Sequence, residues 1–330
     1  MASSPATLGL FLASGLTAGL ALAPRTFQNP LAHGADPCLT FDKGWYYLSV
    51  TTGRDVRIKR ARHLGELKGA KAVTVYHSDD PAQSQAVWAP EFHRFDGKWY
   101  LYVTATAGPE PGHRMFVAEG TGDTPMGPYR FKAKLQTDPK DEFYAIDGHP
   151  FRTPDGRMWF AWCGRPSDTG QGLYLSRMAN PWTLVGEREA LNVGGYGCRF
   201  VREGPETVQR DGKVFLAYSA CGADTPDYKL GMVRADAKAN LLDPAAWTQA
   251  PAPLLQRDDA AGVYGPGHNF FFRSPDGRED WIAYHAKPST RLDYGERDTR
   301  AQRLLWRDGW PFVGTPVPTG VDVPSPSGER

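Results

Sequence analysis

The clearest pattern of hydrophobic and polar positions is a pair of alternating runs joined by a tight turn. Within residues 202–220 the dipeptide Asp211-Gly212 is flanked by alternating apolar positions, with aromatic residues after the turn. An Asp-Gly pair between two such runs predicts a two-stranded antiparallel hairpin. Pro205 marks the opening of its first strand, because proline fits only where no ladder N–H is needed.

This unit recurs along the chain. A proline, a turn glycine and then an aromatic residue appear five times, as Pro37/Gly44/Tyr47, Pro90/Gly97/Tyr100, Pro150/Gly156/Trp159, Pro205/Gly212/Phe215 and Pro266/Gly277/Trp281. Successive glycines are 53, 59, 56 and 65 residues apart, which is long enough for four strands per copy. We therefore predict an all-β, five-bladed β-propeller in which the opening strand of each blade is innermost. The alternative is chance recurrence in an all-β chain rich in proline and glycine.

Length and composition agree with one domain. The 330 residues are 41% hydrophobic and 12% aromatic, and no low-complexity linker divides them. We expect the propeller over residues 26–320, a secretory signal peptide or plain N-terminal tail over 1–25, and a C-terminal tail over 321–330. The balance of 38 basic and 37 acidic residues indicates neither a nucleic-acid partner nor an anionic-membrane surface. A monomer is expected.

The N-terminal segment bears on location. Residues 8–23 are uncharged and end in Ala21-Leu22-Ala23, which is typical of a secretory signal and its cleavage site. No Lys or Arg precedes this run, and Pro24 follows it directly, so a plain tail stays open. The run is too short and too rich in glycine for a membrane span. The chain is expected to be secreted or periplasmic, with a cytoplasmic location as the alternative.

The cysteines give no metal signature. Cys38, Cys163, Cys198 and Cys221 show no C-x-x-C spacing. Cys198 and Cys221 flank the fourth hairpin and could bridge in an exported protein, but the hairpin register does not place them opposite each other. Free buried thiols are the expected state.

Three carboxylates occupy similar places in the repeat. Asp36, Asp147 and Glu203 each stand just before the proline that opens the first, third or fourth unit. In a propeller these acids would point at one end of the central channel. Two carboxylates across a cleft can cleave a glycosidic bond, and a third can raise the pKa of the acid. The alternative is that they serve as turn residues, caps or ligands of a hard cation.

Together, several motifs resemble glycoside hydrolase family 43 over nearly the whole chain after residue 26. They are TFQNPLAHGADP, VWAPEFHRFDGKWYLY, YAIDGHPF, REGPETVQRDGKVFLAYS and YGPGHNFFFRSPDGREDWIAYHA. The resemblance implies a five-bladed propeller that inverts anomeric configuration. It assigns Asp36 as general base, Asp147 as the residue that orients the acid and raises its pKa, and Glu203 as general acid.

The resemblance also implies binding residues. His268 matches an axial histidine that helps hold calcium or another ion in the channel of some members, and Arg300 matches an arginine near the sugar. No cofactor is required. The sequence Asp-Gly-His-Pro in the third motif, where many members have Asp-Pro, leaves the spacing of Asp147 open.

The expected substrate is an arabinose-containing oligo- or polysaccharide. Aromatic residues near strand openings suggest the walls of a small pocket, and they are Trp88, Tyr144, Tyr196 and Tyr264. By resemblance, the expected activity is exo release of terminal α-L-arabinofuranosyl residues from plant polysaccharide side chains. A β-D-xylosidase, an endo-arabinanase and a non-catalytic carbohydrate-binding propeller remain alternatives.

Overall fold

The computed structural model describes residue 1, residues 25–165 and residues 170–329. The expected signal peptide lies almost wholly outside the described residues. No helix in the described part of the chain has the length and the hydropathy that a membrane span requires.

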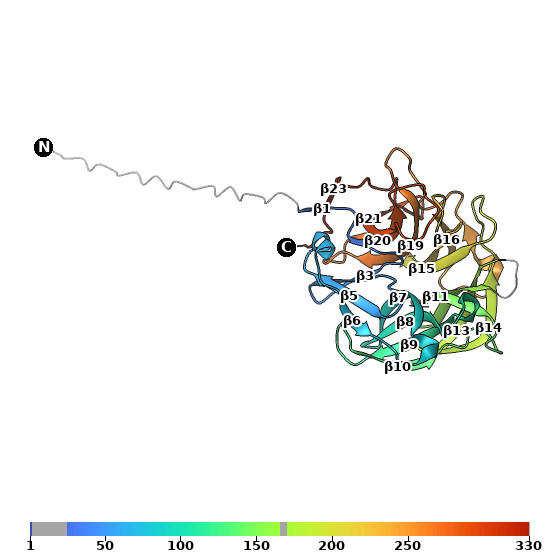
Figure 1. Cartoon of the computed structure of the whole chain (residues 1–330). Coiled ribbons are helices and arrows are strands. Elements are labelled where there is room, and N and C mark those ends of the chain that lie inside the picture. The colour runs from blue at the N-terminus through green and yellow to red at the C-terminus, as the bar shows by residue number, and fades with distance from the viewer. Residues whose placement is uncertain (2–24, 166–169, 330) are drawn as a thin grey trace.

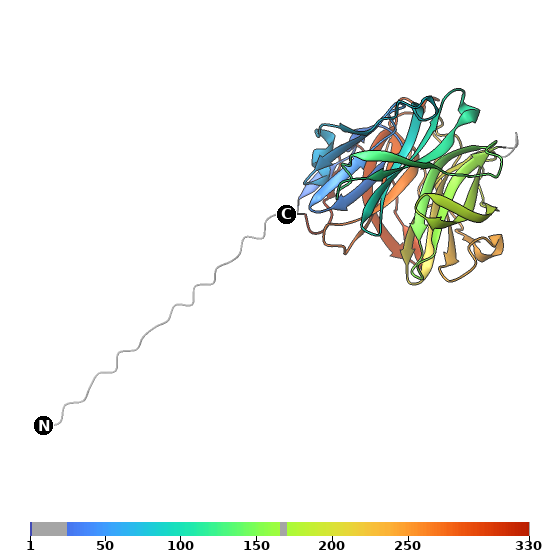
Figure 2. The same ribbon diagram turned by 90° about the horizontal axis from the view of Figure 1, so that it is seen from below.

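Five antiparallel sheets form a ring, which confirms the five-bladed propeller (Figure 1). Blade 1 contains β3 (Cys38–Asp42), β4 (Trp45–Ser49), β5 (Val56–Ala61) and β6 (Val73–Tyr76). Blade 2 contains β7 (Gln85–Phe95), β8 (Lys98–Thr106), β9 (Arg114–Gly120) and β10 (Tyr129–Lys134). Blade 3 contains β11 (Tyr144–Arg152), β12 (Met158–Arg165), β13 (Gly172–Asn180) and β14 (Thr183–Leu191). Figure 2 shows the blue, teal and green blades side by side in that order.

The remaining blades complete the circle. Blade 4 contains β15 (Arg202–Arg210), β16 (Lys213–Ala220), β17 (Lys229–Asp236) and β18 (Thr248–Gln249). Blade 5 contains β19 (Tyr264–Arg273), β20 (Asp280–Lys287), β21 (Asp298–Arg307) and β2 (Ala32–His33). Short 3-10 helices occur in the connections, namely η1 (Leu64–Lys68), η2 (Pro81–Gln83), η3 (Glu110–Gly112) and η4 (Pro244–Ala246). The first strands β3, β7, β11, β15 and β19 contact one another in turn around the axis, so they are innermost as expected.

The ring is closed by the N-terminal part of the chain. β2 pairs with β21 in the register Ala32 with Thr299, and β1 (Thr26–Gln28) pairs with β23 (Asp322–Pro324). Residues 321–330, expected as a tail, therefore contribute a paired strand. Arg300 lies within β21, and the fourth strand of blade 5 comes from the N-terminal part of the chain. β22 (Trp310–Phe312) pairs only with the far end of β21.

Two-residue turns join several strand pairs. At Lys43-Gly44, Asp96-Gly97, Asp211-Gly212 and Asp308-Gly309, both residues have positive φ. The residues flanking these turns pair directly, as Arg210 does with Lys213. A two-residue turn with positive φ at both positions matches the right-handed twist of the strands that it joins, and glycine or aspartate tolerates this conformation best. The hairpins predicted from these dipeptides are thus confirmed.

The apolar core lies mainly between neighbouring blades. The interfaces of blades 1 and 2, 2 and 3, 3 and 4, 4 and 5, and 5 and 1 each contain a cluster of buried side chains. The large members are mostly aromatic, such as Tyr47, Trp159 and Trp281, each at most 2% exposed. Aromatic side chains bury a large apolar area per residue, which explains the aromatic positions of the repeat.

Cys198 and Cys221 form a disulfide, which corrects the expectation that they are free. Cys198 lies in the loop before β15 rather than in the strand, and its N–H donates to the carbonyl of Gly195 at 2.9 Å. This turn brings its Cα within 5.1 Å of the Cα of Cys221, just past the end of β16. The register of the hairpin therefore does not decide whether these two cysteines can meet, because both lie outside its paired strands. Cys38 and Cys163 are free and buried, as predicted.

Candidate active site

The inner strands share one backbone feature at the pocket end. One residue just before or in the first half of the first strand of each blade has φ between 42° and 56°; these residues are Asp36, Ala89, Asp147, Gly204 and Gly265. In blades 2 to 5 the pairing of the inner strand with its neighbour also shifts register at this point. A β-bulge re-aims the side chains next to it. Here the bulges turn the strand openings of several blades toward the axis.

Gly204 shows why glycine is needed at one of these positions. Its φ is 54°, and a Cβ there would lie 3.1 Å from the ring of His268. Any larger residue would meet both the backbone cost of positive φ and this close contact. Gly204 therefore allows β15 and β19 to approach each other beside the acids.

The three predicted acids face a single pocket. It has a volume of about 640 Å³, and Asp36, Asp147 and Glu203 all line it. Each comes from a different blade, and the three lie at the same end of the channel. The sequence prediction that the repeat gathers these carboxylates in one polar well is thus matched by the geometry.

Asp36 is held as a carboxylate. Its Oδ2 accepts a hydrogen bond from the Thr51 hydroxyl at 2.6 Å, and its Oδ1 lies 3.2 Å from His268 Nδ1 and 3.5 Å from Arg297 Nη1. Burial alone would raise the pKa of Asp36, but the positive charges of His268 and Arg297 lower it well below its ordinary value. This group is ready to accept a proton near neutral pH.

Glu203 has the opposite character. Burial first, and then the nearby charge of Asp147, raise its pKa to about 7. Its Oε1 accepts a hydrogen bond from the Tyr228 hydroxyl at 2.8 Å. Burial also raises the pKa of Asp147, to about 6, and its Oδ2 accepts the N–H of Gly204 at 3.1 Å. The pocket therefore pairs one strongly ionised carboxylate, Asp36, with one carboxyl, Glu203, that keeps its proton up to about pH 7.

The structure brings some of the predicted binding residues into the pocket. Trp88, Tyr144 and His268 line it. Trp88 is stacked on His113 at 4.0 Å between ring centroids, so its indole is fixed before any ligand binds. His268 is 6% exposed and donates its backbone N–H to the Ser219 hydroxyl at 2.8 Å.

Other predicted residues lie elsewhere. Tyr196 packs against the core between blades 3 and 4 and donates its hydroxyl to the carbonyl of Ala250 at 3.0 Å. Tyr264 does not line the pocket. Arg300 is 1% exposed and donates to the Val317 carbonyl at 2.9 Å and the Thr319 hydroxyl at 2.5 Å. The predictions that Tyr196 and Arg300 contact substrate are not supported by these positions.

Sequence reasoning missed several residues around Asp36. Arg297, three positions before Arg300 in the same segment, lines the pocket and faces the carboxylate. His285 is fully buried, and its Nδ1 accepts the Asp36 N–H at 3.2 Å. Burial lowers the pKa of His285 to about 4, so the ring is neutral. The only signal in the sequence was the polar character of His285 in the otherwise apolar run WIAYHA.

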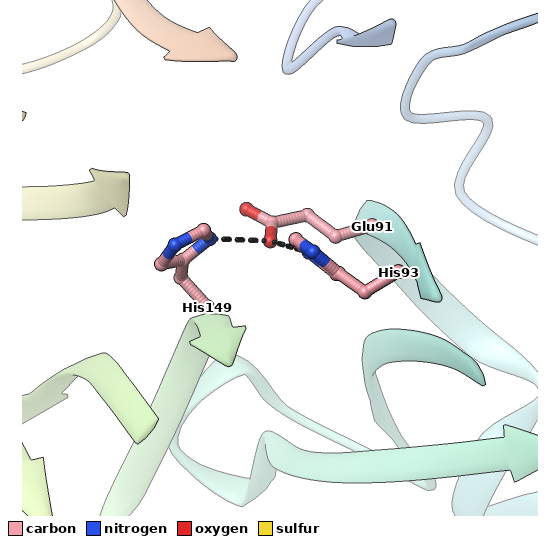
Figure 3. Close-up of side chains that lie close together, drawn as sticks. All are labelled: Glu91, His93 and His149. Atoms are coloured by element: carbon pink, nitrogen blue, oxygen red, sulfur yellow. Dashed lines mark hydrogen bonds and ion pairs between the residues drawn. The ribbon is translucent and has the colours of Figure 1, made fainter. Parts of the chain in front are cut away.

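A second polar cluster lies farther along the inner strands. Among the described residues, the one group with metal-ligand spacing is Glu91, His93 and His149 (Figure 3). His268, the predicted ion ligand, is not part of this group and instead pairs with Asp36. Neither Glu91, His93 nor His149 lines the pocket of the three acids.

A propeller with three carboxylates converging on one pocket, two of them with opposite protonation, has the architecture of a glycoside hydrolase. The sequence matches the glycosyl hydrolases family 43 over residues 27–311, and the chain belongs to that family. Its recognition from sequence motifs is thus confirmed.

Known proteins resemble the chain closely. An extracellular exo-α-(1→5)-L-arabinofuranosidase from Streptomyces avermitilis is 37% identical over 90% of this chain, which spans 65% of that protein's length. A protein of the same name from Streptomyces chartreusis is 36% identical over 84% of this chain and 89% of its own length. The crystal structure of an α-L-arabinofuranosidase from Lactobacillus brevis superposes with a TM-score of 0.81 at 31% identity, covering 89% of this chain and 98% of that one.

Proposed function

We propose that the protein is an inverting, exo-acting glycoside hydrolase that releases terminal α-L-arabinofuranosyl residues from plant polysaccharide side chains. The observation that carries this proposal is the pairing of an ionised Asp36 with a protonated Glu203 in one pocket. Environments that push the pKa values of two carboxyls apart define a base and an acid.

The roles follow from these charges. Asp36, held ionised by His268 and Arg297, activates a water molecule by accepting its proton. Glu203, protonated near pH 7, donates its proton to the leaving oxygen. Asp147 raises the pKa of Glu203 by charge repulsion and is itself fixed by the Gly204 N–H. For inversion we expect the Asp36 and Glu203 carboxyls to stand about 6.5–9.5 Å apart, which leaves room for the water.

The sugar assignment is supported by the relatives and by the pocket. Both Streptomyces relatives carry arabinofuranosidase names, and so does the Lactobacillus brevis structure. The pocket walls include Trp88 and Tyr144, which offer apolar faces, and Arg297, which offers donors for sugar hydroxyls. α-L-Arabinofuranose and β-D-xylopyranose present similar hydroxyl and scissile-bond directions, so the acids alone do not separate them.

The remaining assignments belong to the same proposal. Secretion is supported by the uncharged N-terminal run, by the extracellular names of the relatives and by the Cys198–Cys221 disulfide, since disulfides persist in oxidising compartments. We also predict that the protein is a monomer, that it needs no cofactor for hydrolysis, and that it has no nucleic-acid or membrane partner.

The decisive test compares substrates. We expect kcat/KM to be higher on 4-nitrophenyl α-L-arabinofuranoside than on the β-D-xylopyranoside, and linear arabinan to yield arabinose as the first product. A proton-NMR time course should show the inverted anomer initially. Preference for the xyloside would contradict the sugar, early oligosaccharides would contradict exo action, and a retained anomer would contradict the mechanism.

A further inference from the structure

Lys287 is a fully buried lysine at the end of β20. It is 0% exposed and is the last residue of the strand. It follows His285 by two positions, so both side chains project from the same face of β20. His285 accepts the N–H of Asp36 at 3.2 Å. Because a buried lysine is costly unless its donors are satisfied, the partners of Lys287 need an explanation.

The side chain of Lys287 donates to three main-chain oxygens. Its Nζ lies 2.5 Å from the carbonyl of Asp224 and 2.9 Å from the carbonyl of Asp293, and it also donates to the carbonyl of Arg291. An ammonium group has three donors and no acceptor, so these contacts satisfy it completely. Since all three acceptors belong to the backbone, the contact depends on the path of the chain around the lysine.

The acceptors lie on two loops that line the pocket of the three acids. The first, here called the blade 4 loop, is residues 221–228 between β16 and β17, and its Gly222 lines the pocket. The second, here called the blade 5 loop, is residues 288–297 between β20 and β21, and its Tyr294 and Arg297 line the pocket. One buried side chain thus joins two parts of the same pocket wall.

The two loops are packed closely around the lysine. The Asp293 N–H donates to the carbonyl of Asp224 at 3.1 Å, so this carbonyl accepts from both Asp293 and Lys287. On the side of β19, a Cβ at Gly265 would lie 2.7 Å from the Thr225 carbonyl and 3.7 Å from Lys287 Cδ. Glycine at this position therefore lets the blade 4 loop approach the strand beside the lysine.

Each loop leads to a partner of one catalytic carboxyl. The blade 5 loop ends at Arg297, whose Nε donates to the Tyr294 carbonyl at 3.0 Å and whose Nη1 lies 3.5 Å from Asp36 Oδ1. The blade 4 loop ends at Tyr228, whose hydroxyl donates to Glu203 Oε1 at 2.8 Å. The path of these loops therefore affects the surroundings of both the base and the acid.

We propose that Lys287 is a positioning residue of the active site, which holds the blade 4 and blade 5 loops together and thereby places Arg297 and Tyr294 in the wall that faces the sugar. The kinetic part of this inference rests on the proposed function, whereas the contact between the loops does not. A misplacement of about 1 Å in a binding group can cost up to about a hundredfold in rate, so a small movement of the blade 5 loop is enough to matter.

A lysine that only stabilises the fold would behave differently. Its removal would lower Tm but leave the kinetic constants of the folded enzyme unchanged. Removal of a positioning residue changes KM even in protein that is fully folded. The tests below therefore measure kinetics and loop protection well below Tm.

Lys287→Met is the main variant, because methionine keeps most of the length of the apolar stem and removes all three donors. We expect KM on 4-nitrophenyl α-L-arabinofuranoside to rise by about tenfold, because the displaced Arg297 and Tyr294 no longer bind the sugar well. The fall in kcat should be smaller, because Asp36 keeps His268 as a partner. Lys287→Gln, which keeps two donors, should give a smaller rise in KM.

Tyr284→Phe is the matched control. Tyr284 is also 0% exposed and lies on β20, but it faces the other side of the sheet, where its hydroxyl donates to Gln302 Oε1 at 2.7 Å. Its substitution removes a buried hydrogen bond from the same strand without touching either loop. It should lower Tm and leave KM unchanged.

A double variant tests whether Lys287 acts through Arg297. If it does, Lys287→Met combined with Arg297→Lys should raise KM little more than the stronger single substitution, because both remove the same interaction. Multiplied effects on KM would show that the two residues act independently, which contradicts the proposal.

Hydrogen exchange of the full chain examines the loops without any substrate. In Lys287→Met, peptides from residues 221–228 and 288–297 should both lose protection, whereas both should stay protected in Tyr284→Phe. An inactive wild type would refute the proposed function, and the exchange data would still decide whether Lys287 joins the loops.

Chemical rescue separates the donors from the packing of the stem. Lys287→Ala leaves space for propylammonium, which carries three N–H donors and should lower the KM of this variant. Tetramethylammonium at equal ionic strength has no N–H donor and should not. If Lys287→Met does not fold, Lys287→Gln and this rescue decide in its place.

Three results would overturn the proposal. The first is wild-type KM in a folded Lys287→Met or Lys287→Gln variant, whether or not the loops lose protection. The second is a raised KM with both loops still protected, which would place the effect elsewhere. The third is equal rescue of Lys287→Ala by propylammonium and tetramethylammonium, or no rescue by either.

Discussion

At the scale of single residues, the pocket works through charge differences between neighbours. Asp36 lies next to His268, Arg297 and the Thr51 hydroxyl. Glu203 is buried, lies near the charge of Asp147, which raises its pKa, and accepts a hydrogen bond from the Tyr228 hydroxyl. The same functional group is therefore kept ionised at one position and protonated at the other. This contrast decides which substitutions should affect which step.

Glu203→Gln should lower kcat/KM on arabinan by about 10²–10⁴, the scale of a lost general acid. The loss should be much smaller on 4-nitrophenyl arabinofuranoside, because a good leaving group needs no protonation. Asp36→Asn should abolish turnover of both substrates, because neither reacts without an activated water. Wild-type activity on arabinan should also fall above about pH 7, where Glu203 loses its proton. Near wild-type arabinan turnover in Glu203→Gln would refute the acid assignment.

Glu203 should also reduce stability at alkaline pH. Its pKa is raised from 4.5 to about 7 in the folded protein, so the folded state binds more protons between these values, and stability falls as pH rises through this window. Glu203→Gln removes this loss. Thermal unfolding should therefore give the variant a Tm roughly 2–4 °C above wild type at pH 8 and no gain at pH 4. An equal gain at both pH values would point to a different cause.

Arg297 and Arg300 form a matched pair for testing contact with the sugar. Arg297→Lys should raise KM and lower kcat/KM by about tenfold, because the lysine cannot reproduce the fixed donors of a guanidinium facing the pocket. Arg300→Lys should lower Tm through lost hydrogen bonds to Val317 and Thr319 while KM stays unchanged. Steady-state kinetics and thermal melts of both variants distinguish the roles. A larger KM effect from Arg300→Lys would restore the original assignment.

The sequence identified the acids but not the arginine for a physical reason. Asp36, Asp147 and Glu203 stand at the same place in a repeated unit, so their convergence follows from the repeat. Arg297 stands just before β21 and Arg300 within it, and the direction of a side chain depends on where the strand begins. Strand boundaries are the least certain part of sequence reading, so nothing in the sequence favoured Arg297, which lines the pocket, over Arg300.

At the scale of elements, turns were predictable and bulges were not. The dipeptides Asp96-Gly97 and Asp211-Gly212 predict their turn conformation from sequence, because Asp-Gly is typical of turns in which both residues have positive φ. The bulge at Asp147 has no such signature, because aspartate at positive φ is maintained by the surrounding structure. The Cys198–Cys221 bridge was missed in the same way, since it depends on an irregular loop.

The disulfide should stabilise the loop beside the acids. Cys198 precedes Val201, and Cys221 precedes Gly222, and both Val201 and Gly222 line the pocket. Closing a loop of 23 residues contributes about 3 kcal/mol in the chain-entropy account, so Cys198→Ser with Cys221→Ser should lower Tm by roughly 4–6 °C. KM should rise more than kcat falls.

Reduction supplies the control for this prediction. Dithiothreitol should lower the Tm of the wild type toward that of the double variant and leave the double variant unchanged. A wild-type Tm that does not respond to reduction, with free thiols counted at four under denaturing conditions, would show that the bridge does not form.

At the scale of the whole molecule, five blades were predictable because the repeat spans the chain, but the closure was not. β2 contains two residues, Ala32 and His33, which is too short for any periodic signal. Its assignment to blade 5 depends on the meeting of both ends of the ring. β23 similarly reads as a tail until its pairing with β1 is known.

Removal of residues 321–330 tests how much this outer pairing contributes. The deletion removes Val323, 8% exposed in the core between blades 5 and 1, and Glu329, which accepts the Leu64 N–H at 3.0 Å. We expect a Tm lower by roughly 3–6 °C, from the lost apolar burial and hydrogen bonds, with kcat and KM unchanged. Val323→Ser should give a smaller shift. A changed KM would mean that the segment supports the pocket.

The pairing of β2 with β21 can form only late in synthesis, because the two strands lie near opposite ends of the chain. Ala32 leaves the ribosome early, whereas its partner Thr299 emerges near the end of translation. Contacts between such distant residues form late, because the entropy of closing a long loop must be overcome first. Throughout synthesis β2 is an unpaired strand, and the last blade presents an open edge until closure. The nascent chain therefore reaches a protease-resistant state only after translation is almost complete, a schedule compatible with crossing a membrane unfolded.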